Sequence, residues 1–194
     1  DLAIDVVVES TGKFTTRQEL EQHLAAGAGR VLLTVPPTDT IDHMVVVGVN
    51  DQALTREHRL ISNASCTTNC LAPLAKVLDE AFTIRHGIMT TVHAYTNDQR
   101  LADIPHTDFR RSRAAAENII PTTTGAARAV GVVLPQLQGK LDGIAVRVPV
   151  ADGSVVDLVV QFAQQPDRDA INAAVRHAAE GFLKGVLEYS EAPL

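Results

Sequence analysis

Three largely apolar runs in the first 50 residues constrain the fold most. They are Ile4–Val8, Val31–Val35 and Met44–Val49. Runs of this length are typical of strands buried on both faces of a parallel sheet. Between the first two, Thr16-x-x-Glu19 is a capping box that opens a helix, and Gly27 is placed to end it. Strand, helix and strand in this order predict a parallel α/β unit with a right-handed crossover.

The pattern changes from about residue 60. A short strand over Leu60–Asn63 is expected to lead into a helix that starts near Cys66, because Pro73 is tolerated only close to a helix N-terminus. A last amphipathic helix is expected to end at Gly181. The further strands expected are Ile88–His93, followed by Ile144–Val148 and Val155–Phe162 joined across the turn signal Asp152-Gly153. This half therefore predicts an antiparallel or mixed sheet with helices covering one face.

Composition excludes several classes of protein. The 194 residues carry a formal net charge of −6 with acids and bases mixed along the chain, which argues against a dedicated nucleic-acid or anionic-membrane binder. No apolar run reaches the roughly 20 residues of a membrane span, and no secretory signal is present at the start. Two cysteines four positions apart form no disulfide framework, so a reducing, cytoplasmic setting is expected. The abrupt ends predict a piece cut from a longer chain.

Cys66 lies at the predicted strand-to-helix junction. Unpaired backbone N–H groups and the helix dipole favour a thiolate there. From its position alone, Cys66 is equally well interpreted as a reactive thiol or as a small buried residue. Cys70, one turn further, is expected to be a core residue. The C-x3-C spacing lacks a second pair of ligands, so no metal site is expected.

His93 is the best candidate for a catalytic base. It ends a predicted strand and faces opposite to Val92, and a histidine near a thiol can raise the thiolate fraction and move a proton. Six other histidines compete for this role. Of these, His23 on a helix and His58 in a charged run are expected to be solvated.

Candidate anion contacts come from three further segments. Thr124-Gly125 precedes a predicted helix. These residues could bind an anion at the helix N-terminus, or one of the threonines could be an ordinary N-cap. In Ile144–Val148 the even positions are expected to face a core and Arg147 to face away from it, for phosphate binding or for an ion pair with Asp157. Three arginines in the long segment Ala94–Pro121 fit a solvated face, a subunit contact or phosphate contacts; they are Arg110, Arg111 and Arg113.

Together these segments resemble the phosphorylating glyceraldehyde-3-phosphate dehydrogenase family over essentially the whole chain. The most specific is the nine-residue stretch around the first cysteine. The matching segments are Ser62–Cys70, His93–Gln99, Arg110–Ala116, Pro121–Ala127, Arg147–Pro149 and Asp152–Asp157.

The resemblance implies a role for each matching residue. Cys66 would be the nucleophile and His93 the base. Substrate or inorganic phosphate would be held by Ser65, Thr67, Thr96, Thr124, Gly125 and Arg147, with Arg111 nearby. The cofactor, NAD or NADP, would contact Ser10-Thr11-Gly12, Thr34 and Asn97. The segment from about Tyr95 to Pro121 would reach the cofactor pocket of an adjacent subunit in a homotetramer.

The resemblance also implies an architecture and an activity. Residues 1–66 would be the C-terminal half of a Rossmann-type NAD domain, and residues 67–194 an α+β catalytic domain, both of an α/β protein. The family's glycine-rich dinucleotide loop is absent from the chain, and Pro36-Pro37-Thr38-Asp39 departs from its usual turn. The implied reaction oxidises glyceraldehyde 3-phosphate to 1,3-bisphosphoglycerate through a Cys66 thioester. Three alternatives stay open, an erythrose-4-phosphate dehydrogenase, a cysteine hydrolase and a non-catalytic interaction domain.

Overall fold

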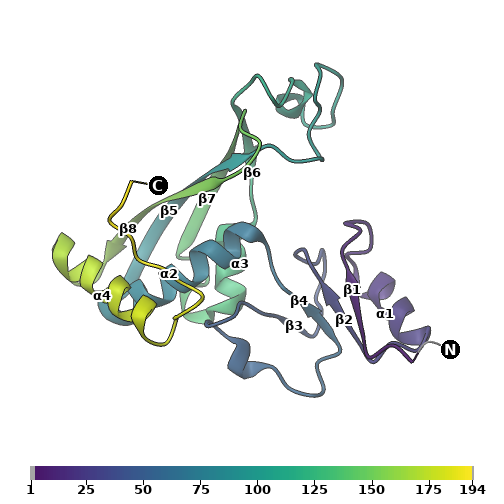
Figure 1. Cartoon of the computed structure of the whole chain (residues 1–194), viewed down its shortest axis with the longest axis horizontal. Helices are drawn as coiled ribbons and strands as arrows, with labels where there is room; N and C mark the ends of the chain where they lie inside the picture. The colour runs from purple at the N-terminus through teal and green to yellow at the C-terminus, as the bar shows by residue number, and fades with distance from the viewer. Residues whose placement is uncertain (1–2, 194) are drawn as a thin grey trace.

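The computed structural model describes residues 3–193, whose strands form two four-stranded sheets that lie side by side (Figure 1). The first sheet contains β1 (Val6–Glu9), β2 (Arg30–Leu33), β3 (His43–Met44) and β4 (Leu60–Ser62). Their order is β1-β2-β4-β3 and all pairs are parallel. Helix α1 (Arg17–Ala25) connects β1 to β2, as the sequence predicts. Its capping box is confirmed, since Thr16 accepts from the backbone of Glu19 and the Glu19 carboxylate accepts from Thr16.

The second sheet is mixed, also as predicted. It contains β5 (Ile84–Ala94), β6 (Ile120–Thr123), β7 (Leu141–Val148) and β8 (Ser154–Phe162), in the order β6-β7-β5-β8. β5 and β7 are parallel, and the two outer pairs are antiparallel. β7 and β8 flank β5 and so do not pair with each other across Asp152-Gly153, as a hairpin would.

Three helices pack on one face of the second sheet (Figure 1). They are α2 (Cys66–Phe82), α3 (Ala126–Val133) and α4 (Arg168–Glu180), which ends at Gly181 as predicted. Short 3-10 turns lie at Asp51–Ala53, Phe109–Ser112 and Pro135–Leu137. The core between sheet and helices includes Leu71, Met89, Val130 and Leu137, each almost fully buried. Over residues 3–193, no helix combines the length and the apolar character that a membrane span requires.

Two of the predicted buried strands are wrong in detail. In β1, Val6 and Val8 are 48% and 57% exposed, so this strand is not covered on both faces. The run Met44–Val49 contributes only Met44 to a strand, because Asn50 bonds the backbone of Val46 and Met44 and turns the chain. Met44, Val46 and Val49 of this run pack against the core of the second sheet instead.

Pro73 does not mark the start of α2. The helix begins at Cys66 as predicted, but Pro73 lies two turns inside it and is buried. The helix continues because its apolar side packs on the core, and tertiary packing outweighs the loss of one backbone hydrogen bond.

The expected facing of Ile144–Val148 is reversed. Ile144 is 51% exposed, whereas Ala145 is 6% exposed and faces the helices. Arg147 is therefore on the same face of β7 as Ala145 and is half-buried at the strand end. The side chains of β7 do alternate between the two faces of the sheet, as predicted. However, the face away from the helices also carries apolar side chains and is exposed, so hydrophobicity did not show which face packs on the core. The exposed side chains of this open face include Ile88, Ile144, Val155 and Val159.

The two histidines expected to be solvated both have partners. His23 Nε2 lies 3.1 Å from Oε2 of Glu9, whose side chain is only 3% exposed. The ring of His58 is half-buried and stacks on His43 with ring centres 4.9 Å apart. Both contacts join residues that are distant in the sequence, which is why local charge did not predict them.

Candidate active site

The nucleophile candidate begins helix α2. β4 ends at Ser62, and three residues later Ser65 caps the helix with its Oγ accepting from the backbone N–H of Thr68 at 3.0 Å. Cys66 is the first helical residue and its side chain is exposed. The thiol therefore lies where free N–H groups and the helix dipole stabilise negative charge.

His93 comes from the other sheet and meets Cys66. It is the penultimate residue of β5, and its Nε2 lies 3.4 Å from Cys66 Sγ. Of the two interpretations left open for Cys66, the geometry favours the reactive thiol. A cysteine paired with a histidine in this way suits nucleophilic attack with proton transfer.

Arg147 is the third side chain of this group. It is paired with His93 in the β5–β7 register, and its Nη1 lies 2.6 Å from His93 Nδ1 and donates to the Ala94 carbonyl at 2.9 Å. His93 Nδ1 also lies 2.7 Å from the Ala94 carbonyl oxygen, so Arg147 and the backbone hold this side of the ring while Nε2 faces Cys66. This contact replaces the ion pair with Asp157 that the sequence left open.

Part of the Arg147 fork remains available. Among residues 3–193, its buried Nε has no hydrogen-bond partner. Burial lowers the pKa of Arg147, and the neighbouring Arg111 adds to this, although Asp98 and Cys66 oppose it. A buried guanidinium with an unpaired donor fits an anionic ligand such as a phosphate.

Asp98 links three of the predicted residues, and the sequence analysis assigned it no role. Its carboxylate accepts from the Thr96 hydroxyl and from Arg111 Nη1, the latter at 2.6 Å. Arg111 Nε also donates to Thr122 at 3.1 Å. Partial burial raises the pKa of Asp98, but Thr96, Arg111 and Arg147 together lower it. The signal available in the sequence was an acid in a loop that also contains four arginines.

The N-termini of α2 and α3 lie together beside Cys66. Thr68 Oγ1 is 3.5 Å from the carbonyl of Ala126, the first residue of α3. The N-cap of α3 is Gly125, which is exposed, and the Thr124 hydroxyl accepts from the N–H of Ala126 at 3.1 Å. Thr67 is buried at the start of α2. Two helix N-termini with hydroxyl groups form a favourable position for an anion.

The predicted cofactor residues lie at the carboxyl ends of the first sheet. Glu9 ends β1, and its carboxylate accepts from the N–H of Thr11 at 2.7 Å and from its hydroxyl. Thr34 donates its N–H and hydroxyl to the Glu9 carbonyl. Gly12 has a φ of +70°, which favours glycine at this turn. Ligands of parallel α/β sheets bind at this edge, so the turn fits one end of a nucleotide.

Asn97 is placed apart from these residues. It is exposed in the turn after β5, and the hydrogen bonds of the described residues do not connect it with the Ser10–Gly12 turn. Ser10 is likewise exposed.

Cys70 is not the core residue that the sequence predicted. Its side chain is exposed, one turn along α2 from Cys66. Desolvation by the surrounding protein nevertheless raises the pKa of the Cys70 thiol, and Cys66 adds to the effect. Less thiolate is therefore available at Cys70 at neutral pH.

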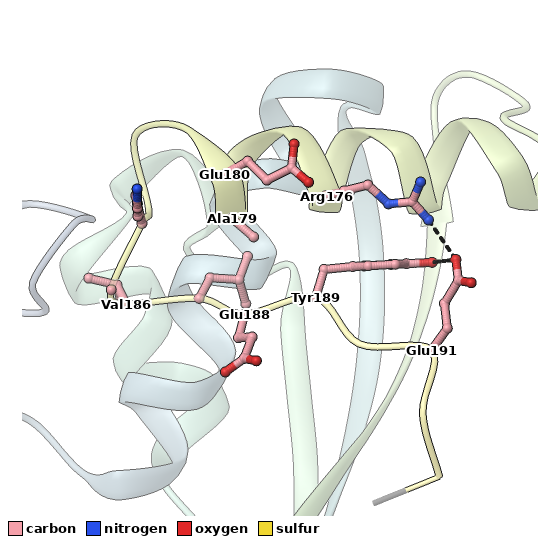
Figure 2. Close-up of a pocket in the computed structure, with 10 residues that line it drawn as sticks. Arg176, Ala179, Glu180, Val186, Glu188, Tyr189 and Glu191 are labelled. Carbon is pink, nitrogen blue, oxygen red and sulfur yellow. Dashed lines mark hydrogen bonds and ion pairs between the residues drawn. The ribbon is translucent and has the colours of Figure 1, made fainter.

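A cavity of about 760 Å³ lies away from these residues, beside the C-terminal end of α4 (Figure 2). Arg176 extends over the ring of Tyr189, with its guanidinium 4.6 Å from the ring centre, and Glu191 accepts hydrogen bonds from both. None of the predicted site residues lines this cavity.

Comparison with known proteins identifies the family of the second sheet and its helices. Residues 65–194 match the family model for the C-terminal domain of glyceraldehyde 3-phosphate dehydrogenase. The chain belongs to this family. The match begins one residue before α2, so it includes the whole second sheet and its helices.

Similar proteins extend over the first sheet as well. A glyceraldehyde-3-phosphate dehydrogenase 2 of Streptomyces avermitilis is 58% identical over 195 residues, covering 100% of this chain and 58% of the relative. The glyceraldehyde-3-phosphate dehydrogenase of Mycobacterium tuberculosis is 59% identical over 194 residues, covering 100% and 57%. That of Geobacillus stearothermophilus is 57% identical over 195 residues, covering 100% and 58%. The chain thus spans less than two thirds of these relatives.

Proposed function

We propose that this chain provides the catalytic centre of a phosphorylating glyceraldehyde-3-phosphate dehydrogenase. The observation that carries the proposal is the 3.4 Å contact between Cys66 Sγ and His93 Nε2, with Arg147 on the other ring nitrogen. Family membership supplies the substrate, and this contact supplies the nucleophile and the proton carrier.

The chemistry divides into two steps at Cys66. His93 takes the Cys66 proton, the resulting thiolate adds to the aldehyde carbon of glyceraldehyde 3-phosphate, and His93 returns the proton to the new alkoxide, which gives the hemithioacetal hydroxyl. NAD or NADP, when bound, would accept a hydride from this carbon. His93 Nε2 takes the hydroxyl proton as the thioester forms. An oxygen of inorganic phosphate then attacks the thioester carbon, which releases the Cys66 thiolate and gives 1,3-bisphosphoglycerate.

Two groups of residues would hold the phosphates. Ser65, Thr67, Thr124 and Gly125 lie at the paired helix N-termini, which suits one anion. Thr96 and Arg147 would hold the other, with Arg111 oriented beside them by Asp98. The unpaired Arg147 Nε is the observation that favours a ligand there.

Cofactor binding is proposed at the edge of the first sheet. Ser10, Thr11, Gly12 and Thr34 would contact it there, and Asn97 would approach from the second sheet. NAD and NADP are both compatible with these residues. Residues 1–66 would then be the C-terminal half of a Rossmann-type domain and residues 67–194 the catalytic domain. The four parallel strands and the Glu9-centred turn support this division.

Assembly as a homotetramer is also proposed. The loop between β5 and β6 extends beyond the ends of the sheet (Figure 1), with Leu101 72% and Phe109 88% exposed. Together with the open apolar face of the second sheet, this supports contacts between subunits. A cytoplasmic location is proposed on the same family grounds.

The test is product analysis with the full-length protein. Glyceraldehyde 3-phosphate, NAD and phosphate should give one reduced cofactor per acyl phosphate, which hydroxylamine traps, and both should disappear without phosphate. Free carboxylic acid formed at a rate independent of phosphate would instead indicate a hydrolase. A higher kcat/KM with erythrose 4-phosphate would contradict the proposed substrate. Activity unchanged by Cys66→Ser would contradict the proposed site.

A further inference from the structure

The turn that presents Cys66 contains a strained residue. Ala64 has a φ of +57°, in the left-handed region that residues with a Cβ rarely adopt. It is only 1% exposed, so the turn is held inside the protein. Such a conformation persists only where surrounding contacts enforce it.

One side chain bonds both carbonyl groups that flank Ala64. Nδ2 of Asn69 donates to the carbonyl of Asn63 at 2.8 Å and to that of Ser65 at 2.9 Å. An amide nitrogen has two hydrogens, and both are used here. Asn69 lies in the first turn of α2 and thus connects the strained turn to the helix that it begins.

The other side of the turn is attached to the first sheet. The Ser62 hydroxyl accepts from the N–H of Ala64 at 3.0 Å and donates to the Val35 carbonyl at 2.7 Å. The N–H of Asn63 donates to the Leu33 carbonyl at 2.9 Å. Ser62 therefore fixes the incoming chain, and Asn69 fixes where the helix leaves the turn.

We propose that Asn69 is a positioning residue for the nucleophile. Its carboxamide holds Ala64 in the left-handed conformation and thereby sets where Cys66 Sγ meets His93 Nε2. The inference rests on the proposed function for its effect on catalysis, but its effect on the thiol is independent of any substrate. An aspartate of the same shape would place a carboxylate against two carbonyl oxygens, so a neutral double donor is required.

The experiment compares Asn69→Leu with the wild type in the full-length protein. Leucine has a similar size and no donor, so the turn loses both bonds. Iodoacetamide should alkylate Cys66 about tenfold more slowly at neutral pH, with the midpoint of its pH profile raised, because thiolate pairing with His93 is weakened. Labelling of Cys70 should not change. Turnover should fall about 10- to 100-fold while KM for the aldehyde changes little, since a misplaced nucleophile affects kcat.

Ala64→Gly separates positioning from general destabilisation. Glycine adopts a positive φ without strain, so the turn needs less support. Ala64→Gly alone should have little effect, and in combination with Asn69→Leu it should restore much of the lost alkylation rate and turnover. Asn172→Leu on α4 is the matched control and should leave both unchanged. Asn69→Ser is measured in parallel, so that poor folding of the leucine variant does not remove the comparison.

Two results would overturn the proposal. One is a folded Asn69 variant with the wild-type alkylation profile of Cys66 and wild-type turnover. The other is a lowered melting temperature with normal Cys66 reactivity, unaffected by Ala64→Gly, which would make Asn69 a purely structural residue. If the wild type oxidises no aldehyde, the proposed function fails, while the alkylation profiles still decide the role of Asn69.

Discussion

The two sheets approach the candidate site at the same kind of edge but with different groups. In the first sheet, Thr11 after β1 and Thr34 after β2 both bond Glu9, and β4 leads through a short turn to Cys66. In the second, β5 and β7 end in His93 and Arg147, which are paired in register. The first sheet therefore shapes the site through its backbone, and the second supplies charged side chains.

Strand length explains this division. β1 and β4 have 4 and 3 residues, whereas β5 and β7 have 11 and 8. Long paired strands hold a side chain at their end with little freedom, which suits groups that must meet within a few ångströms. Short strands that lead into turns place N–H and hydroxyl groups, which suit a ligand that is bound and released. Substitutions in the second sheet should therefore affect chemistry, and those in the first should affect the shape of the turns.

The largest loss of activity is expected on substitution of Cys66, which lies between the two sheets. Cys66→Ser in the full-length protein should lower kcat by at least about 10³-fold, because a hydroxyl replaces the thiolate nucleophile. Cys70→Ser, one turn along α2, should retain most of the activity. Steady-state rates of NADH formation measure both. Comparable losses in the two variants would show that the helix N-terminus does not distinguish the cysteines.

A loss almost as large is expected from the second sheet. His93→Asn keeps a polar side chain at the end of β5 but cannot take the hemithioacetal proton, so kcat should fall about 10²- to 10⁴-fold. The pH profile of the residual activity should lose the contribution of this group. Retention of both the rate and the profile would mean that another residue carries the proton.

Substitution of Arg147 tests whether the second sheet also binds the phosphate of the substrate, in addition to supplying His93 for the reaction. Loss of a charge-assisted hydrogen bond costs about 1.5–3 kcal/mol, so Arg147→Leu should weaken use of the phosphorylated aldehyde about 10- to 150-fold. Because Arg147 also bonds His93, glyceraldehyde without phosphate should suffer a smaller loss and not none. Arg168→Leu, a surface arginine, is the control. Equal losses with both substrates would assign Arg147 to His93 alone.

The smallest effect is expected in the first sheet. The Thr11 hydroxyl lowers the pKa of Glu9 below its ordinary value of 4.5, against the effect of burial, and His23 assists. A carboxylate with a lowered pKa stabilises the fold above that value and loses this contribution as the pH falls through the folded pKa. Glu9→Gln should therefore cost about 1–2 kcal/mol of unfolding free energy at pH 7.

The difference in unfolding free energy between Glu9→Gln and the wild type should decrease as the pH falls towards 3, where Glu9 itself becomes protonated. Denaturant unfolding at the two pH values measures this. A gap between Glu9→Gln and wild type that does not depend on pH would contradict a role for the charge.

The sequence predicted what local patterns determine. The start of α2 at Cys66, the alternation along β5 and the capping box at Thr16 are confirmed, because each depends on residues close in the chain. The sequence-based prediction was wrong where residues distant in the chain determine which side chains are buried. Ile144 and Arg147 were assigned to the wrong faces because the positions of α2 and α3 define the core side. Cys70 was expected to be buried for its apolar neighbours, yet its own side of the helix is uncovered.

Asp98 and Asn69 show the same limit within the site. Each lies in a recognisable segment, but its contacts depend on how the turn around it is folded, and Arg111 reaches Asp98 from 13 residues away. The two carboxylate contacts of Asp98 and the two carbonyl contacts of Asn69 exist only after the chain has folded. The predicted cofactor and phosphate residues are now placed in space, and their roles remain predictions for the experiments above.

Helix α2 carries the nucleophile at its first residue and packs into two hydrophobic clusters along its length. Leu71, Ala75 and Leu78 belong to one cluster, and Val77 belongs to the other with Leu183. Because α2 packs against both clusters, it should not unfold independently of them. Its inner backbone amides should therefore exchange with deuterium only when the whole domain unfolds. Cys66 should consequently keep its orientation up to the unfolding transition, and heat inactivation should follow global melting without an earlier, separate loss of the thiol.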